Sequence, residues 1–331
     1  MTTNGKPKFA MYWAAACGGC EIATLNIHEK ILDFDANFEP VFWPVAMDGK
    51  VRDVEALPDQ SILLTLFNGG IRNDENEEIA HHLRHKSQIL VAFGSCACQG
   101  GIPGLANLGS LKSIFEVAYH TVSTDNPQGI HPGSSFNVPE GELHLPTLYP
   151  VLKTLDQVVP VDYYMPGCPP ESEQIAAVID LVIGVLQGKA QLPAKGATIG
   201  AGASTLCDEC PRKRDVKKIE KFVRIQDLKT IDPELCLLEQ GIPCNGPATR
   251  NGCGAVCPKA NAQCIGCYGP AEGVADFGTR LMSALASVVE SKDPKEISRI
   301  LDGIPDPAGQ FYRFSLAGSL LRASKSAWKN E

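Results

Sequence analysis

The sequence lacks the features that mark a membrane protein, a nucleic-acid-binding protein or a nucleotide-binding enzyme. No apolar run approaches the roughly 18 residues that span a bilayer. The start, MTTNGKPKFAMYW, has neither an apolar signal core nor a twin-arginine pair, so we expect a cytoplasmic location. A net charge of -8 excludes the basic footprint that nucleic acids require. GAGAST (200–205) fails the G-x-G-x-x-G pattern and no P-loop motif occurs, so no dinucleotide site is expected.

Cysteine is the residue that the sequence has in excess. There are 13 cysteines among 331 residues, in a chain long enough for two domains. The remaining composition, 44% hydrophobic and 21% charged, is ordinary for a globular protein. Disulfide frameworks belong mainly to small secreted domains, whereas cysteine clusters in cytosolic chains usually bind metal. The cysteines therefore predict metal centres.

The first part of the chain alternates strand-like and helix-like segments. Buried apolar runs ended by Pro or Gly predict strands within 8–15, 38–45, 61–70, 88–96 and 158–170. Helical spacing of apolar residues or helix-start signals predict helices within 21–34, 73–87 and 170–188. This alternation predicts an α/β domain at residues 1–192 with a flavodoxin-like, doubly wound parallel sheet.

The second part of the chain has a different character. Residues 103–147 are expected to be irregular apart from a helix within 108–119, and 194–205 is predicted to be a linker. Residues 206–270 hold eight cysteines, many Gly and Pro, and little strand signal. Such a segment buries too little apolar surface to fold without cross-links or metal. We therefore expect a smaller, cysteine-rich, irregular and α-helical iron–sulfur domain at 193–331, with helices near 274–290 and 294–304.

Four cysteines of the first domain follow predicted strands. Ligands bind at the carboxyl ends of the strands in such sheets, and four cysteine thiolates commonly hold a 4Fe–4S cube. The cysteines lie in CGGC, GSCACQGG and PGCPP, and are Cys17, Cys20, Cys96 and Cys168. A CxxC motif alone would also suit a redox pair or half a zinc site, but the combination of motifs favours a cluster.

The other eight cysteines are enough for two more cubes. They are Cys207, Cys210, Cys236, Cys244, Cys253, Cys257, Cys264 and Cys267. The spacing Cys253-x3-Cys257-Pro258 is similar to the end of a bacterial ferredoxin run, whose full pattern is absent. Spacing alone does not divide the eight into two sites. Two structural zinc sites are the alternative, although three thiolate sites in one chain favour electron transfer.

The motifs together resemble a known family. CGGCE (17–21), GSCACQGG (94–101), PGCPPE around Cys168, TLCDEC, ELCLLEQGIPC, CIGCYGP and FYRFSLAGSLL are similar to the small subunits of nickel–iron hydrogenases. The resemblance runs nearly end to end. It is strongest to the cytoplasmic branch represented by the methyl-viologen-reducing (deazaflavin-non-reducing), heterodisulfide-reductase-linked hydrogenase of anaerobic methanogens.

The resemblance implies three 4Fe–4S clusters and assigns their ligands. The proximal set, nearest the nickel–iron site, is Cys17, Cys20, Cys96 and Cys168. The distal set is Cys207, Cys210, Cys236 and Cys244. The medial set is Cys253, Cys257, Cys264 and Cys267. Periplasmic members have His at the position of Cys207 and Pro at that of Cys257, so cysteine at both implies three full cubes.

The resemblance also implies an electron-transfer role. Electrons from H2, oxidised at a nickel–iron centre on a large partner subunit, would pass to a 2Fe–2S subunit and on to heterodisulfide reductase. Neither FMN nor NAD is expected on this chain. A deazaflavin-reducing or NAD(P)-coupled hydrogenase is the nearest alternative. The small subunit of respiratory complex I shares the first domain, but uses adjacent cysteines that are absent here. A zinc-stapled interaction protein is the non-enzyme alternative.

Three further features lie outside the cluster ligands. Cys98 is the spare cysteine and is interpreted as a small buried residue. Glu21 is either a proton relay at the interface with the large subunit or a hydrogen-bond partner near the proximal cluster. A third group has the helical spacing of a metal site but lies among charged residues, which favours a solvated helix face: His81, His82 and His85.

Overall fold

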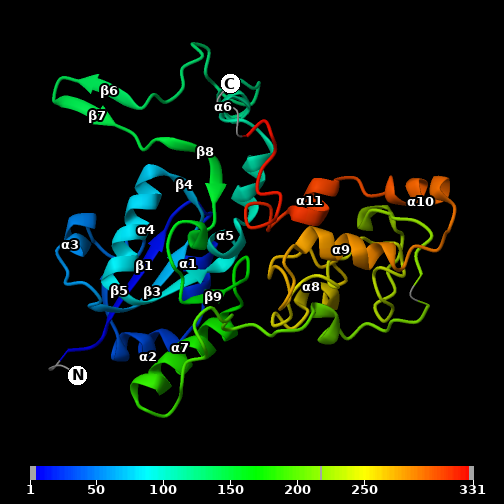
Figure 1. Cartoon of the computed structure of the whole chain (residues 1–331), viewed down its shortest axis with the longest axis horizontal. Helices are drawn as coiled ribbons and strands as arrows, with labels where there is room; N and C mark the ends of the chain where they lie inside the picture. Colours follow the sequence, from blue (N-terminus) through cyan, green and yellow to red (C-terminus); the bar gives the residue numbers. More distant parts are fainter. Residues whose placement is uncertain (1–4, 217, 328–331) are drawn as a thin grey trace.

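A sheet of five parallel strands forms the centre of the first lobe (Figure 1). The computed structural model describes residues 5–216 and 218–327. The strand order is β2 (Glu39–Phe42), β1 (Lys8–Trp13), β3 (Ile62–Asn68), β5 (Ser87–Phe93) and β9 (Tyr163–Met165). The direction of winding reverses between β1 and β3, which is the flavodoxin-like order. The predicted fold class is confirmed.

Helices cover both faces of this sheet. One face packs against α1 (Gly19–Leu25), α2 (Lys30–Asn37) and α7 (Ser172–Leu186), and the other against α3 (Val51–Glu55) and α4 (Asp74–Lys86). Successive side chains of a strand point to opposite faces, so Phe9 and Met11 enter one core while Ala10 and Tyr12 enter the other. Burial on both faces explains why the strands are continuous apolar runs.

Local signals determine where these helices begin and end. The predicted cap of α4 is present, because the side chain of Asn73 accepts a hydrogen bond from the backbone N–H of Asn76 at 2.8 Å. Residues 21–34, expected as one helical stretch, are divided between α1 and α2. His28 lies between them with a φ of 56°, in the left-handed region that interrupts a helix.

The segment between β5 and β9 contains more regular structure than expected. It includes α5 (Gly94–Gln99), the 3-10 helices η1 (Ile102–Leu108) and η2 (Leu155–Gln157), α6 (Leu111–Tyr119), and a β6 (Ser135–Val138)–β7 (Gly141–His144) hairpin. β8 (Leu148–Lys153) pairs with β4 (Ile71–Asn73). The expectation of irregular chain over 103–147 apart from one helix was wrong. The hairpin side chains are almost all exposed, so no buried apolar run marks its strands.

Part of the predicted linker belongs to the sheet. The backbone N–H of Tyr164 donates to the carbonyl of Ala197 at 3.1 Å, and that of Ile199 to the carbonyl of Tyr164 at 2.9 Å. Ile199 is buried in the core beside α7. Residues 197–199 therefore continue the sheet beyond β9. The domain boundary between residues 192 and 193 stays a prediction.

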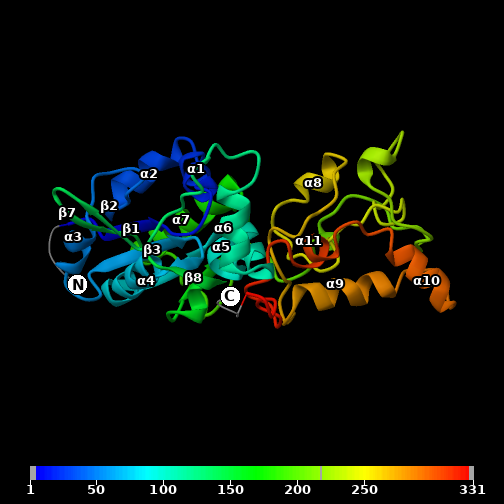
Figure 2. The same ribbon diagram turned by 90° about the horizontal axis from the view of Figure 1, so that it is seen from above.

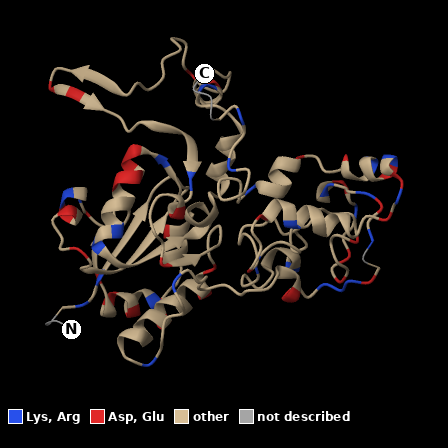
Figure 3. Cartoon of the chain, viewed as in Figure 1, with Lys and Arg blue, Asp and Glu red and all other residues tan. Residues whose placement is uncertain are grey.

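The second lobe lies beside the first along the long axis of the molecule (Figure 2). It contains η3 (Leu206–Asp208), η4 (Ile225–Asp227), α8 (Val256–Lys259), α9 (Phe277–Ala286), α10 (Pro294–Leu301) and α11 (Pro307–Tyr312). The helices α9 and α10 were predicted and α11 was not. Charged residues of both signs lie along the outer edge of this lobe (Figure 3). Throughout the described chain, no helix is long and apolar enough to cross a membrane.

Residues 314–327 return from the second lobe to the first. The N–H of Gly101 donates to the carbonyl of Phe314 at 3.0 Å, and that of Gly318 to the carbonyl of Gln99 at 3.0 Å. Ala317 is fully buried against Gly100, where an added Cβ would lie only 2.4 Å from the Ala317 methyl carbon. This segment, the C-terminal strap, therefore holds the end of α5, which carries Cys96.

A buried ion pair closes the edge of the sheet near β9. Asp162 is 6% exposed and accepts hydrogen bonds from Nη1 of Arg84 at 2.6 Å and from the N–H of Leu90 at 2.9 Å. Nζ of Lys195 lies 2.6 Å from its other oxygen. Burial alone would raise the pKa of Asp162, but hydrogen bonds from Lys195, Arg84 and Leu90 outweigh it and leave the pKa below its ordinary value. The ionised carboxylate therefore stabilises the folded protein at pH values above the pKa that Asp162 has in the unfolded chain. This contribution is lost as the pH falls through the lower pKa that Asp162 has in the folded protein.

We predict that Asp162→Asn destabilises the protein by about 3 kcal/mol at pH 7, because Arg84 is left buried without a carboxylate. The thermal denaturation midpoint of the variant and the wild type should converge below pH 3.8, the ordinary carboxyl pKa. Lys195→Ala is the matched control: its side chain is 72% exposed, so the loss should stay under about 1 kcal/mol. Equal losses in the two variants would contradict the prediction.

Candidate iron–sulfur centres

The four thiols of the proximal set meet at the carboxyl edge of the sheet. Cys17 follows β1, Cys20 lies in α1, Cys96 lies in α5, and Cys168 follows β9. Burial raises the pKa of the Cys20 thiol well above its ordinary value, and the charges of Cys96, Glu21, Cys168 and Cys17 raise it further. The four thiols therefore lie together at one edge of the sheet, and their role as cluster ligands stays a prediction.

Glycine backbone surrounds the proximal thiols. Gly94 has a φ of +81°, and a Cβ there would lie 2.4 Å from Sγ of Cys20. A Cβ at Gly101 would lie 2.5 Å from Sγ of Cys96. Any larger residue at these positions would push directly against a thiol. Because neither glycine has a side chain, space stays open beside the two sulfurs. A bulky inorganic cluster that accepts hydrogen bonds from nearby backbone N–H groups needs such space.

The four thiols of the distal set line one small cavity of about 30 Å³, together with Arg212 and Arg214. Burial raises the pKa of Cys207 to about 12, with Cys244 and Cys236 raising it and Arg214 lowering it. A Cβ at Gly246 would lie 3.2 Å from Sγ of Cys207 and 3.7 Å from Sγ of Cys244. Because Gly246 has no side chain, the space beside these two sulfurs stays open.

The medial set is gathered around α8. Burial raises the pKa of Cys267 to about 12, and the charges of Cys253, Cys168 and Cys257 raise it further. Cys264 is the most interior member: burial raises its pKa well above the ordinary value, and the charges of Cys244 and Cys267 add to this. Cys264 therefore lies between the distal set and the other medial thiols.

Direct contacts join the three sets in a row. The Ser95 hydroxyl, next to Cys96, donates to the carbonyl of Cys267, and the backbone of Cys168 hydrogen-bonds to the Cys267 thiol. The N–H of Cys264 donates to Sγ of Cys244 at 3.4 Å. The order in space is therefore proximal, medial, distal, running from the first lobe into the second.

Glu21 is buried beside the proximal set. Its side chain is 2% exposed, and Oε2 accepts a hydrogen bond from Nδ2 of Asn68 at 2.7 Å. Oε1 has no hydrogen-bond partner within the described chain. Burial raises the pKa of Glu21, although its hydrogen bonds, including that from Asn68, partly oppose the rise. A buried carboxyl with one free oxygen and a raised pKa can hold or release a proton nearer neutral pH than an exposed one.

Cys98 faces away from the proximal set. Its thiol donates to the carbonyl of Ala92 at 3.1 Å and packs into the core beneath α4. Burial is the main cause that raises the pKa of the Cys98 thiol, and the charge of Asp156 raises it further. These contacts agree with the interpretation of Cys98 as a small buried residue.

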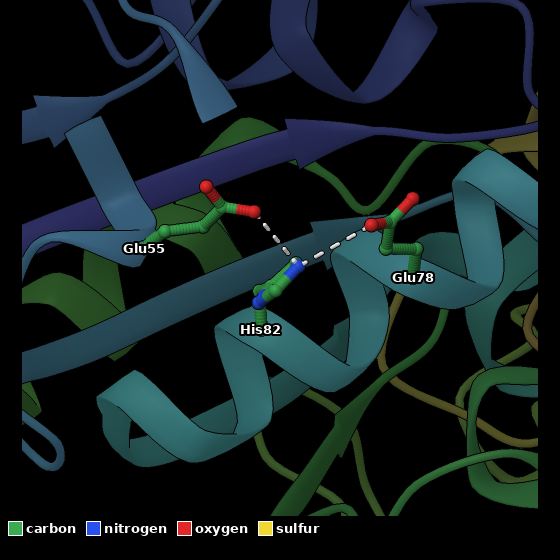
Figure 4. Close-up of side chains that lie close together, drawn as sticks. All are labelled: Glu55, Glu78 and His82. Carbon is green, nitrogen blue, oxygen red and sulfur yellow. Dashed lines mark ion pairs between the residues drawn. The ribbon is translucent and has the colours of Figure 1, made fainter. Parts of the chain in front are cut away.

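The histidines of α4 lie far from the cysteines in the fold. His81 and His85 are exposed. Nε2 of His82 lies 3.3 Å from Oε1 of Glu55 and 3.7 Å from Oε1 of Glu78, so the protonated imidazole would pair α3 with α4 (Figure 4). This supports the interpretation as a solvated, charged helix face.

Two residues that support the cysteines were not predicted from the sequence. The carboxylate of Glu209, inside the CDEC motif, accepts hydrogen bonds from the N–H groups of Gly252 at 3.0 Å and Ala255 at 3.3 Å. A residue between two distal cysteines therefore orients the loop that carries the medial Cys253. Arg212 is buried and donates to four oxygens around the distal cavity. Its position in the charged run PRKR gave no sign of burial.

The donor chemistry fits iron–sulfur clusters. Twelve thiols lie in groups of soft ligands with adjoining glycine backbone. Burial raises the pKa of the more interior thiols, such as Cys20, Cys207 and Cys264, so metal binding must displace protons there and supply the positive charge that makes close-packed thiolates stable. Zinc satisfies the same donors, and the thiols alone do not distinguish the two metals.

Comparison with known proteins adds four findings. A family model described as "NADH ubiquinone oxidoreductase, 20 Kd subunit" matches residues 17–182. The iron-sulfur subunit of the F420-non-reducing hydrogenase of Archaeoglobus profundus is 41% identical over 95% of this chain and 97% of its own. A subunit of the F420-non-reducing hydrogenase of Methanothermobacter marburgensis is 36% identical over 96% of both chains. A solved NAD+-reducing [NiFe]-hydrogenase chain aligns with a TM-score of 0.44 at 28% identity, over 57% of this chain and 96% of that one.

We predict that Cys17→Ala removes one cluster, so that iron falls from about twelve to about eight atoms per chain. Cys17 is exposed, so the change should leave the core packing intact. Cys98→Ala is the matched control and should keep all the iron. Anaerobic iron analysis with EPR spectroscopy measures both variants. Full iron content in Cys17→Ala would exclude Cys17 as a ligand.

Proposed function

Because the chain belongs to the family of nickel–iron hydrogenase small subunits, we propose that it relays electrons from H2 oxidation on a large subunit through three 4Fe–4S clusters. The proposal rests above all on the row of contacts that joins the three cysteine sets. Ser95 and Cys168 touch Cys267, and Cys264 touches Cys244. A row of this kind suits stepwise electron transfer, whereas separate structural zinc sites would not need such contacts.

We propose the ligand sets implied by the family resemblance. The proximal set would hold the first cluster, the medial set the second and the distal set the third. When bound, each cluster supplies one-electron redox chemistry, with a potential set by charge, hydrogen bonds and exposure. The residues of this chain orient the thiolates, exclude water and provide hydrogen bonds to sulfur. Gly94 and Gly101 leave space beside the proximal thiols, and the backbone of Gly246 hydrogen-bonds to the Cys244 thiol.

The large subunit, carrying the nickel–iron centre, would dock beside Cys17. This cysteine is exposed, and three large apolar side chains on the neighbouring segments are also exposed: Trp13 by 42%, Ile22 by 61% and Leu25 by 52%. Exposed apolar groups in one region are typical of a protein interface. The chain has no free cysteine set for a nickel–iron centre, so that centre belongs on the partner.

Electrons would leave at the distal set. A groove beside the distal set is lined by three cations and one carboxylate: Arg214, Lys218, Arg280 and Glu239. Its excess of positive charge suits an acidic surface on a redox partner. The 2Fe–2S subunit and heterodisulfide reductase of the methyl-viologen-reducing branch are the proposed acceptors. Relatives named F420-non-reducing support this branch over a deazaflavin-reducing one. The cytoplasmic location expected from the sequence stays a prediction.

Glu21 is the proposed proton relay toward the large subunit. It follows the proximal ligand Cys20, lies on the same short helix as the exposed Ile22, and keeps one oxygen without a partner. Its raised pKa brings the carboxyl closer to the range in which it can both accept and release a proton. Asn68 would hold the carboxyl in position through its hydrogen bond to Oε2.

Anaerobic purification tests the proposed function directly. The relay requires about twelve Fe and about twelve labile sulfides per chain, since each cube holds four of each. A nickel-containing large subunit should co-purify with the chain. Zinc without sulfide would exclude the relay in favour of the zinc-stapled alternative, and clusters without a nickel partner would exclude the hydrogenase role.

We predict that Glu21→Gln lowers H2-dependent dye reduction by the whole complex about 100-fold, the scale of a lost proton-transfer group. Glutamine keeps an oxygen for Asn68, so the EPR signals of all three clusters should not change. The exposed Glu29→Gln serves as the control and should keep full activity. Wild-type activity in Glu21→Gln would assign Glu21 a hydrogen-bonding role only.

A further inference from the structure

Arg212 is a buried cation without a carboxylate partner. The residue is only 7% exposed. Nε donates to the carbonyl of Pro258 at 2.9 Å, and Nη1 donates to the carbonyls of Asp232 at 2.7 Å and Leu235 at 2.8 Å. Nη2 donates to Oδ1 of Asn261 at 2.5 Å. All four acceptors are neutral, and no ion pair of Arg212 occurs among residues 5–216 and 218–327.

A buried charge of this kind requires a compensating charge nearby. Taking a guanidinium out of water costs several kcal/mol, and neutral hydrogen-bond acceptors recover only part of this cost. Arg212 lines the same cavity as the four thiols of the distal set. Four thiolates around a cube would place net negative charge in that cavity. A loaded distal site would therefore supply compensating charge for Arg212 and also for Arg214, which lines the same cavity.

Arg212 also connects two ligand-bearing loops. Leu235 directly precedes the distal ligand Cys236, and Pro258 directly follows the medial ligand Cys257. The planar guanidinium reaches both carbonyls at once, which a lysine ammonium with its single nitrogen would not reproduce. The side chain thus lies at the junction of the distal and medial sets.

We propose that Arg212 is a positioning residue that raises the reduction potential of the distal cluster through its buried charge. The inference rests on the proposed function and deepens it. Reduction adds one electron, supplied from H2 through the medial site, and so adds one negative charge to the distal cavity. A fixed cation stabilises the more negative state, and net charge is among the factors that set cluster potentials. No bond forms or breaks at Arg212.

An EPR-monitored redox titration of the purified hydrogenase complex tests this proposal. In Arg212→Gln the ratio of reduced to oxidised distal cluster, at a fixed applied potential, should fall at least tenfold, equal to 59 mV for one electron. Arg212→Lys keeps the charge and should stay closer to the wild-type ratio. Lys213→Gln is the matched control: it removes the same charge one residue away, but its side chain is 76% exposed, so solvent should hold the change below twofold.

The other outcomes also decide for or against the proposal. An intact distal signal in Arg212→Gln that moves no more than in Lys213→Gln would show that the buried charge does not act on the cluster. If Arg212→Gln loses the distal signal, the result for Arg212→Lys decides between the two roles. A signal retained in Arg212→Lys near the wild-type potential supports the electrostatic role. Loss of the signal in both variants means that Arg212 has a purely structural role. A wild-type protein without a distal signal would instead refute the proposed function.

Discussion

The gathering of buried thiols is the constraint on which the whole molecule depends. Free thiols contribute little to folding, and thiolates at such close range repel one another unless metal binds them. The two lobes meet this constraint differently. The first lobe has a complete double-sided core around its sheet and presents the proximal set on a rigid edge. The second lobe has a smaller core, into which Cys244 and Cys264 are themselves packed, so metal bound by these thiolates would become part of its interior.

Sequence reasoning succeeded where one physical signal dominates. Strands buried on both faces are continuous apolar runs, so their ends, and with them Cys17, Cys96 and Cys168, could be located. It failed where the signal is weak or distributed. The β6–β7 hairpin has exposed side chains, and residues 197–199 join the sheet through backbone hydrogen bonds that any sequence can make. The burial of Arg212 depends on carbonyls more than 20 residues away, which no local pattern reveals.

The two ends of the cysteine row differ in their electrostatic surroundings. Glu21, at the proximal end, is a buried acid whose pKa is raised by burial. Arg212, Arg214 and Arg280 lie at the distal end, where the cavity and the neighbouring groove are positively charged. In the proposed function, such an arrangement would separate the two products of H2 oxidation within one subunit. Protons would be handled where a carboxyl is available, and electrons would be attracted toward the lobe that carries the arginines.

The C-terminal strap has a consequence for biosynthesis. The backbone carbonyl of Arg322 accepts a hydrogen bond from Asn107, and the two residues are 215 positions apart. On the ribosome, the loop that carries Cys96 therefore emerges long before the segment that covers it. Until that segment is made, the end of α5 lacks the hydrogen bonds that Phe314 and Gly318 provide. The chain order thus places this closure of the first lobe after all four proximal cysteines have been synthesised.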